Sequence, residues 1–232
     1  MGYPNVDFWG AMRNGRIEGD DGSIALSTMA VGELVLPTGR LVMADPFCTL
    51  RTALDTYLQV PPGRYPIVVT LADLSSRSDG SHVREAYVSL LLNRGTPELF
   101  RRMLLQNEDG DLARHVEMSP EGDFAGFPVD TGTACMVDAG AIQAWMPTDA
   151  DWDDATLSDA PGSWASQMDQ AGHFREGLAN VPLTRAMNGE NIVLVHSGWG
   201  DGVYPVVGGF DAGGRLVRIH IDFLVCMRVD EL

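Results

Sequence analysis

Residues 191–223, NIVLVHSGWGDGVYPVVGGFDAGGRLVRIHIDF, decide the fold class. Glycine-rich turns separate three apolar runs, at 191–197, 202–210 and 215–227. Polar and apolar residues alternate in the last run, as they do in a strand with one buried face, and this places His220 on the polar face. The turn at 211–214 is typical of a β-hairpin. These features predict an antiparallel three-stranded meander over 191–225.

The first half of the chain has a similar character. Residues 34–47, LVLPTGRLVMADPF, predict a hairpin around a Pro-Thr-Gly turn, and the runs at 64–74 and 81–93 predict another strand pair. Helical spacing predicts one short helix at 96–107 and a second in AGAIQAWMPTD (139–149), which its proline stops. We therefore expect an α+β fold, mainly antiparallel β, with the C-terminal three-stranded meander and two or three short helices.

The composition is that of an ordinary globular protein. Of the 232 residues, 45% are hydrophobic and 21% are charged, so we expect residues 1–232 to form a single globular domain. No apolar run approaches the roughly 20 residues of a membrane-spanning helix, and the N-terminus has no leader pattern. We therefore expect a cytoplasmic protein that does not contact a membrane.

The charge is strongly negative. The formal net charge is −16, and all 16 basic residues are arginine. Such a surface repels the phosphate backbone of nucleic acids, so we expect no nucleic-acid partner. It favours instead a basic protein partner.

The residue types that bind metals occur without the spacing of a metal site. The cysteines, Cys48, Cys135 and Cys226, are odd in number and have apolar neighbours, so we expect buried, reduced thiols. The five histidines lack metal-ligand spacing. The acidic run after residue 148 begins like a calcium loop, but Asp154 stands where glycine belongs, and an acidic surface loop is predicted there. We expect no metal and no cofactor.

The stretch FPVDTGTACMVD (127–138) contains Asp-Thr-Gly, the tripeptide that carries the catalytic carboxylate of aspartic proteases. Such an enzyme needs two carboxylates about 3 Å apart that share one proton. The chain has one Asp-Thr-Gly, which supplies half of that site. We therefore interpret Asp130 as the end of a strand whose carboxylate caps a tight turn, and not as a protease residue.

Four segments carry a family resemblance. They are LPTGRLVMADPF, VPPGRYPIVVTLAD, VDTGTACMVDA and the run NIVLVHSGWGDGVYPVVGGFDAGGRLVRIHIDF. Together they resemble the bacterial family catalogued as domain of unknown function 4241, over residues 34–225. The resemblance implies a bacterial origin and an antiparallel α+β fold, and it carries no established activity.

A set of polar and aromatic residues falls at predicted strand ends and turns of the most specific segments. Trp199 is too large to stay solvated at a turn, so we expect it to pack over the sheet or to line a pocket. Arg64 is expected to be the buried partner of a carboxylate. The candidate binding or structural cluster is Asp130, Asp138, Ser197, Trp199, Asp201, Tyr204, Asp222 and Arg64.

Two functions of different classes fit these observations. The first is a non-enzymatic, acidic binding protein that engages a basic partner, as immunity proteins do when they neutralise secreted bacterial toxins. The alternative is a small hydrolase that uses a carboxylate pair in a polar pocket around Asp130 and Asp201. The two differ in salt dependence, because only charge-steered association slows strongly as ionic strength rises.

Overall fold

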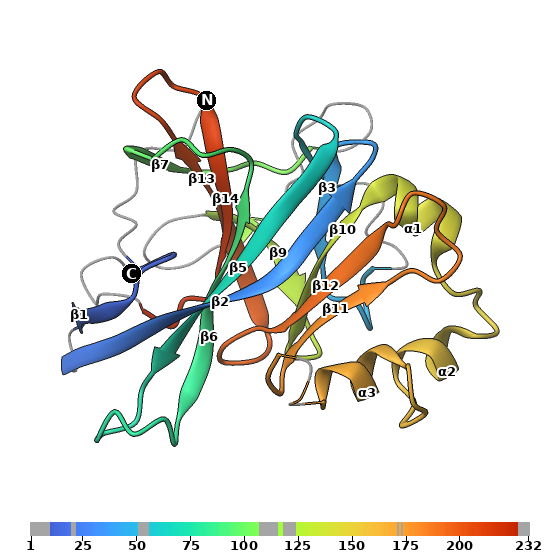
Figure 1. Cartoon of the computed structure of the whole chain (residues 1–232), viewed down its shortest axis with the longest axis horizontal. Helices are drawn as coiled ribbons and strands as arrows, with labels where there is room; N and C mark the ends of the chain where they lie inside the picture. The colour runs from blue at the N-terminus through green and yellow to red at the C-terminus, as the bar shows by residue number, and fades with distance from the viewer. Residues whose placement is uncertain are drawn as a thin grey trace.

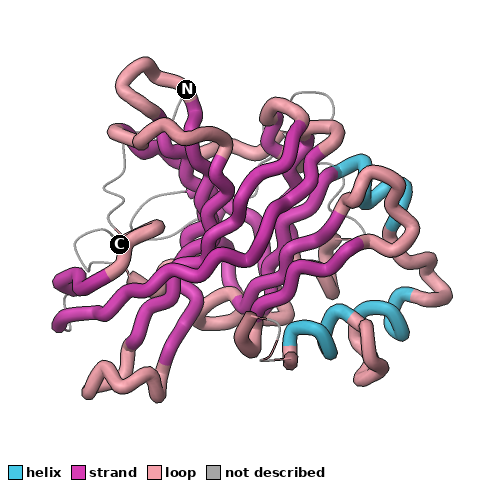
Figure 2. Tube along the Cα trace, in the orientation of Figure 1, coloured by secondary structure: helices cyan, strands magenta, loops and turns pink. Residues whose placement is uncertain are grey.

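The computed structural model describes residues 10–19, 22–50, 56–106, 116–117, 124–170, 172 and 174–226. In these ranges the chain forms two antiparallel β-sheets and three short helices (Figures 1 and 2). The helices lie together at one side of the molecule, next to the smaller sheet.

The larger sheet has nine strands. Their order is β1 (Gly15–Gly19), β2 (Gly22–Leu36), β5 (Gly63–Asp73), β6 (Val83–Leu91), β14 (Leu216–Asp222), β13 (Gly202–Phe210), β9 (Phe124–Val129) and β8 (Val116–Glu117), and β7 (Leu99–Arg102) also pairs with β13. Neighbouring strands pair antiparallel throughout.

The smaller sheet has five strands and is also antiparallel. Their order is β11 (Leu178–Pro182), β12 (Asn191–His196), β10 (Thr133–Asp138), β3 (Arg40–Ala44) and β4 (Leu58–Gln59). The helices are α1 (Ala139–Trp145), α2 (Trp152–Thr156) and α3 (Trp164–Met168).

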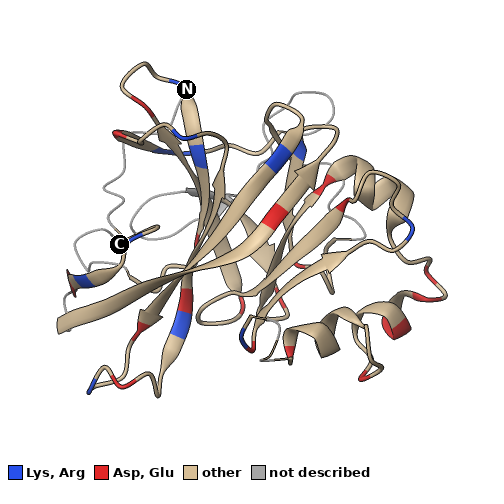
Figure 3. Cartoon of the chain, in the orientation of Figure 1, with Lys and Arg blue, Asp and Glu red and all other residues tan. Residues whose placement is uncertain are grey.

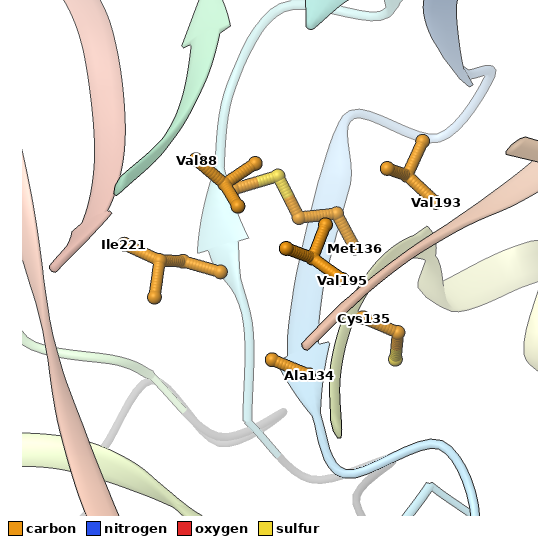
Figure 4. A pocket seen from close by; sticks show the side chains of 7 residues that line it. All are labelled: Val88, Ala134, Cys135, Met136, Val193, Val195 and Ile221. Atoms are coloured by element: carbon orange, nitrogen blue, oxygen red, sulfur yellow. The ribbon is translucent and has the colours of Figure 1, made fainter. Parts of the chain in front are cut away.

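The smaller sheet is the middle layer of three. Along β10, Ala134 and Met136 join the core between the two sheets, whereas Cys135 and Val137 join the core under the helices. Figure 4 shows the first of these cores, where Met136 lies near Val88 of the larger sheet. Burial on both faces explains why the middle strands are apolar without alternation.

Strand β2 connects the two sheets. Its register against β5 shifts between Ala30 and Glu33, and the glycine within the shift has φ 90°. Beyond this bend, the side-chain amide of Asn191 accepts a hydrogen bond from the Val35 N–H at 2.9 Å and donates to the Glu33 carbonyl at 2.7 Å. The Asn180 amide donates to the Val31 carbonyl at 2.8 Å. The side chains of Asn180 and Asn191 thus form hydrogen bonds with backbone groups of β2 that are not paired with a neighbouring strand.

The structure confirms the coarse fold predicted from sequence. It is mainly antiparallel β with three short helices. The predicted pair 64–74 and 81–93 corresponds to β5 and β6, and the predicted helix after residue 138 is α1. None of the helices in the described part of the chain is long and apolar enough to cross a bilayer.

Four predicted elements differ from the structure. The strands β13 and β14 form a hairpin, but β12 pairs with β10 and β11 in the other sheet, so the three-stranded meander over 191–225 is not formed. The turn at 37–39 is present, yet the strands around it enter different sheets. In both places, glycines that reverse the backbone direct the chain from one layer to the other. The local sequence pattern does not predict this change of layer.

Within the predicted helix 96–107, residues 99–102 form the strand β7 beside β13, and residue 107 lies outside the described residues. The acidic loop predicted after residue 148 contains α2. His220 is not on a solvated face: its side chain is buried, and its Nδ1 lies 2.7 Å from the Ser89 Oγ. Among the cysteines, Cys135 and Cys226 are buried as expected, but Cys48 is exposed.

Candidate functional site

The Asp-Thr-Gly turn is organised by a carboxylate that the sequence analysis did not single out. Asp45, which follows β3, is fully buried. Its Oδ2 accepts hydrogen bonds from the N–H groups of Asp130 and Thr131, both at 2.8 Å. Its Oδ1 accepts from the N–H groups of Phe47 at 2.8 Å and Cys48 at 3.0 Å. The Thr131 hydroxyl donates as well, so Asp45 joins two loops by charge-assisted bonds.

The same arrangement occurs a second time around Asp138, which is also fully buried. Its Oδ2 accepts from the Thr38 N–H at 3.0 Å, and the Thr38 hydroxyl donates to it at 2.8 Å. Its Oδ1 accepts from the Gly140 N–H at 2.8 Å and so caps α1. The pair Thr38 and Asp138 therefore repeats the pair Thr131 and Asp45.

A repeated sequence accounts for the two pairs. The segments TGRLVMAD (38–45) and TGTACMVD (131–138) share Thr-Gly, Met and Asp at the same spacing. Strands β3 and β10 pair antiparallel with Met43 opposite Met136, so the two segments are related by a local twofold axis between these methionines. The glycine of each segment has a positive φ, 70° in the first and 65° in the second, as a left-handed turn position requires.

The local twofold axis changes the interpretation of Asp130. The residue that precedes Thr-Gly in the other segment is Pro37, so the position related to Asp130 has no carboxylate. Asp138 lies at the far end of β10, bound to Thr38. The carboxylate that holds the turn is that of Asp45, and not that of Asp130 as the sequence analysis expects. The Asp-Thr-Gly is therefore one half of a structural repeat.

The turn between β12 and β13 is held by its own polar groups. The buried Ser197 donates its hydroxyl to the Gly200 carbonyl at 2.6 Å. The hydroxyl of Tyr204, also buried, lies 2.8 Å from the Ser197 carbonyl and 2.6 Å from that of Gly200. The exposed Asp201 accepts from the Gly132 N–H at 3.0 Å, which connects this turn to the Thr-Gly turn. Asp130, Ser197, Asp201 and Tyr204 are thus brought to one end of β10.

The other predicted residues lie apart from this group or are more exposed than expected. Trp199 is 57% exposed, with the Arg84 guanidinium 5.4 Å from its ring centroid. The ring centroid of His82 lies 6.0 Å from that of Trp199, so Trp199 contacts side chains at the start of β6 while most of its surface stays exposed. Asp222 accepts from the Leu224 N–H at 2.9 Å at the end of β14. Arg64 is exposed and donates to the Asn188 carbonyl at 2.7 Å, so it is not the buried partner of a carboxylate.

The exposed thiol of Cys48 lies close to three carboxylates. Burial raises its pKa, and so do the negative charges of Asp45, Asp130 and Asp201. A thiol needs a lowered pKa to be a nucleophile or a metal ligand at neutral pH. The electrostatics therefore oppose nucleophilic use of this thiol. No group of three His, Cys, Asp or Glu side chains suited to a metal ion occurs among the residues that the structure describes.

A buried ion pair lies near Trp199. The Arg175 Nη1 is 3.3 Å from the Glu85 Oε1, and the Glu85 side chain is almost entirely buried. Burial raises the pKa of Glu85, and the charges of Arg175 and Arg84 offset part of that effect. The sequence gives no signal for this pair, because its members are 90 residues apart in different layers.

A groove of about 650 Å³ opens between the helical layer and the end of β11. Trp164, Val181 and Leu183 lie along it and are themselves buried. Trp145 adds a second indole, and Asp154 of α2 places a carboxylate at the groove. Its size falls in the range of ligand sites, about 300–1,000 Å³. The groove was not predicted from the sequence, because the acidic run was interpreted as a surface loop and not as part of a helix beside a groove.

The charged residues around this groove are acidic, and one of them, Asp154, lines it. Residues 139–170 contain six aspartates and no arginine, lysine or histidine. Figure 3 shows acidic residues on and around α2 and α3 and no basic residue on either helix. The basic residue nearest in sequence to the groove is Arg185, which directly follows Thr184 at the end of the groove lining. The helical layer therefore presents negative charge beside an apolar floor.

Comparison with known families now adds to this geometry. A family model described as a protein of unknown function, DUF4241, matches residues 34–221. The chain belongs to this family. The match spans both Thr-Gly segments and the groove, and ends within β14. Neither the curated proteins nor the solved structures contain a match to this DUF4241 chain.

Proposed function

We propose that this DUF4241 protein is a non-enzymatic binding protein of the immunity type, which engages a basic protein partner in the cytoplasm of a bacterium. The observation that carries the proposal is the acidic helical layer, with six aspartates and no basic residue over 139–170 beside an open groove. Carboxylates concentrated on one face attract a basic partner and raise its association rate.

The polar groups near Asp130 support this choice over the hydrolase. Asp45 already accepts four backbone hydrogen bonds, and Asp201 accepts one that joins two turns. A general base must be free to accept a proton from substrate or water. Both oxygens of Asp45 are occupied by the backbone that they hold in place, and one oxygen of Asp201 is engaged in the same way.

The test is capture of proteins from a lysate of the source organism by two matched variants. The first variant replaces four aspartates of the helical layer with asparagine: Asp153, Asp154, Asp159 and Asp169. The control replaces four exposed glutamates elsewhere with glutamine: Glu18, Glu33, Glu98 and Glu176. Both variants lose four negative charges.

We expect the wild type and the control to retain the same basic protein, released by salt, and the first variant to lose it. Equal retention by all three proteins, or retention that salt does not weaken, would contradict the proposal. Hydrolysis of a substrate that stops when Asp130 or Asp201 is replaced would favour the alternative.

A further inference from the structure

We infer that the groove receives an arginine side chain from an exposed segment of a partner protein. This inference rests on the proposed function, because it names the part of the basic partner that binds. The occupant is deduced from three properties of the groove: its preformed wall, its apolar floor and its exposed acceptors.

The wall is held in place by contacts within the helical layer. Trp152 and Trp164 pack edge to face, with ring centroids 5.8 Å apart and an angle of 71° between the planes. The Thr156 hydroxyl donates to the Trp152 carbonyl at 2.7 Å, and Ser163 caps α3 by accepting from the Ser166 N–H at 3.1 Å. A preformed wall reduces the ordering that binding would otherwise require.

The floor is apolar and flanked by indoles. Val181 lies near the end of β11 and Leu183 directly follows that strand, and Trp164 and Trp145 line the same groove. The Trp145 Nε1 donates to the Glu190 Oε1 at 3.3 Å, which fixes the ring through its polar edge. A surface of this kind accepts methylene groups and the face of a planar cation.

Two of the polar side chains along the groove offer acceptors. The Asp154 carboxylate lines the groove, and within the described residues no donor is bonded to it. The Gln167 amide nitrogen already donates to the Gly162 carbonyl at 2.8 Å, which leaves its oxygen as an acceptor. These acceptors match a ligand that carries several N–H donors.

Arginine combines the required properties better than lysine does. Its three methylenes can lie along Val181 and Leu183 while its guanidinium reaches Asp154. The guanidinium is planar, stacks on aromatic rings and pairs with a carboxylate through two parallel hydrogen bonds. An ammonium group is more strongly hydrated and forms neither contact as well.

The test is titration of the protein with three blocked peptides of one sequence, in which two positions are arginine, lysine or citrulline, followed by NMR at low salt. Asp154→Asn removes the carboxylate, and Ala155→Phe fills the groove without a change of charge. Glu98→Gln, an exposed site on another element, is the charge-matched control. Folding of each variant is checked by its NMR spectrum.

We expect the arginine peptide to shift signals of the groove residues and to bind more tightly than the lysine peptide, while the citrulline peptide does not bind. Asp154→Asn should weaken arginine binding about tenfold, the loss expected for one charge-assisted bond, and Glu98→Gln should change it less than twofold. Ala155→Phe should also weaken arginine binding, because the larger side chain fills the groove.

Equal weakening by Asp154→Asn and Glu98→Gln would show that only total charge matters, which overturns the inference and leaves the proposed function standing. Binding of the citrulline peptide as tight as that of the arginine peptide would overturn the inference, as would no binding of the arginine peptide. Loss of salt-sensitive partner capture would instead overturn the proposed function.

Discussion

Replacement of Asp45 by asparagine should destabilise the protein strongly, whereas the same change at Asp130 should have almost no effect. Each oxygen of the buried Asp45 carboxylate accepts two backbone N–H groups. An asparagine amide in either orientation places its NH₂ group against two of these donors. Each buried donor that loses its acceptor costs about 1–3 kcal/mol, so we expect a loss of roughly 4 kcal/mol.

The twofold-related residue provides an internal comparison. Each oxygen of Asp138 accepts one backbone N–H, from Thr38 or from Gly140, so Asp138→Asn removes one such bond and should cost about 1–3 kcal/mol. Asn is also a good N-cap, which keeps this loss small. Asp130 is exposed, and Asp130→Asn should change stability by less than about 0.5 kcal/mol.

The assay is urea unfolding followed by circular dichroism at neutral pH for the three variants. The expected order of destabilisation is Asp45→Asn, then Asp138→Asn, then Asp130→Asn. An Asp130 variant as unstable as the Asp45 variant would refute the assignment of structural roles. Acid proteolysis that Asp130→Asn abolishes would refute the interpretation of Asp-Thr-Gly as a structural turn.

Three further predictions concern single residues. Burial lowers the pKa of His220 to about 3, so the unfolded state takes up a proton first as pH falls below 6.5. As pH falls from 6.5 to about 3, the free energy of unfolding of the wild type should drop by up to roughly 5 kcal/mol more than that of His220→Asn. Burial raises the pKa of Glu85, so the stability that its protonated side chain contributes is lost as pH rises from about 4.5 to the higher pKa of the folded state. In urea unfolding, Glu85→Gln should flatten the dependence of the unfolding free energy on pH in this range. An unchanged dependence would count against burial as the dominant cause. Trp199→Ala should cost less than about 1 kcal/mol in thermal unfolding, because the ring is largely exposed, and a loss above about 3 kcal/mol would mean that the ring is packed.

Local sequence patterns predicted part of the fold because strands and turns are encoded locally. The apolar runs of β5 and β6 and the proline that follows α1 were sufficient to place these elements. A helix was predicted at 96–107 because the apolar spacing of this segment fits a helix, but pairing with β13 overrides that preference. The position of β12 was missed because an apolar strand buried on both faces gives no sign of which sheet it joins.

The candidate site was predicted only in part. Turn chemistry selected Asp130, Ser197, Asp201 and Tyr204, which the fold brings to one end of β10. It missed Asp45, although the repeat of Thr-Gly and Asp at equal spacing was visible in the sequence. The groove could not have been predicted, because its walls come from α2, α3 and β11, which only tertiary packing brings together.

The central claim is that the acidic helical layer binds a basic partner. The most direct measurement is the association rate constant between this DUF4241 protein and the protein that it retains, at about 20 and 200 mM salt, where the screening length falls from about 20 Å to below 10 Å. We expect the wild-type rate to fall about tenfold or more, and the variant with four helical-layer aspartates replaced to associate slowly at both salt concentrations. A rate that does not change with salt, or a variant that associates as fast as the wild type, would contradict the claim.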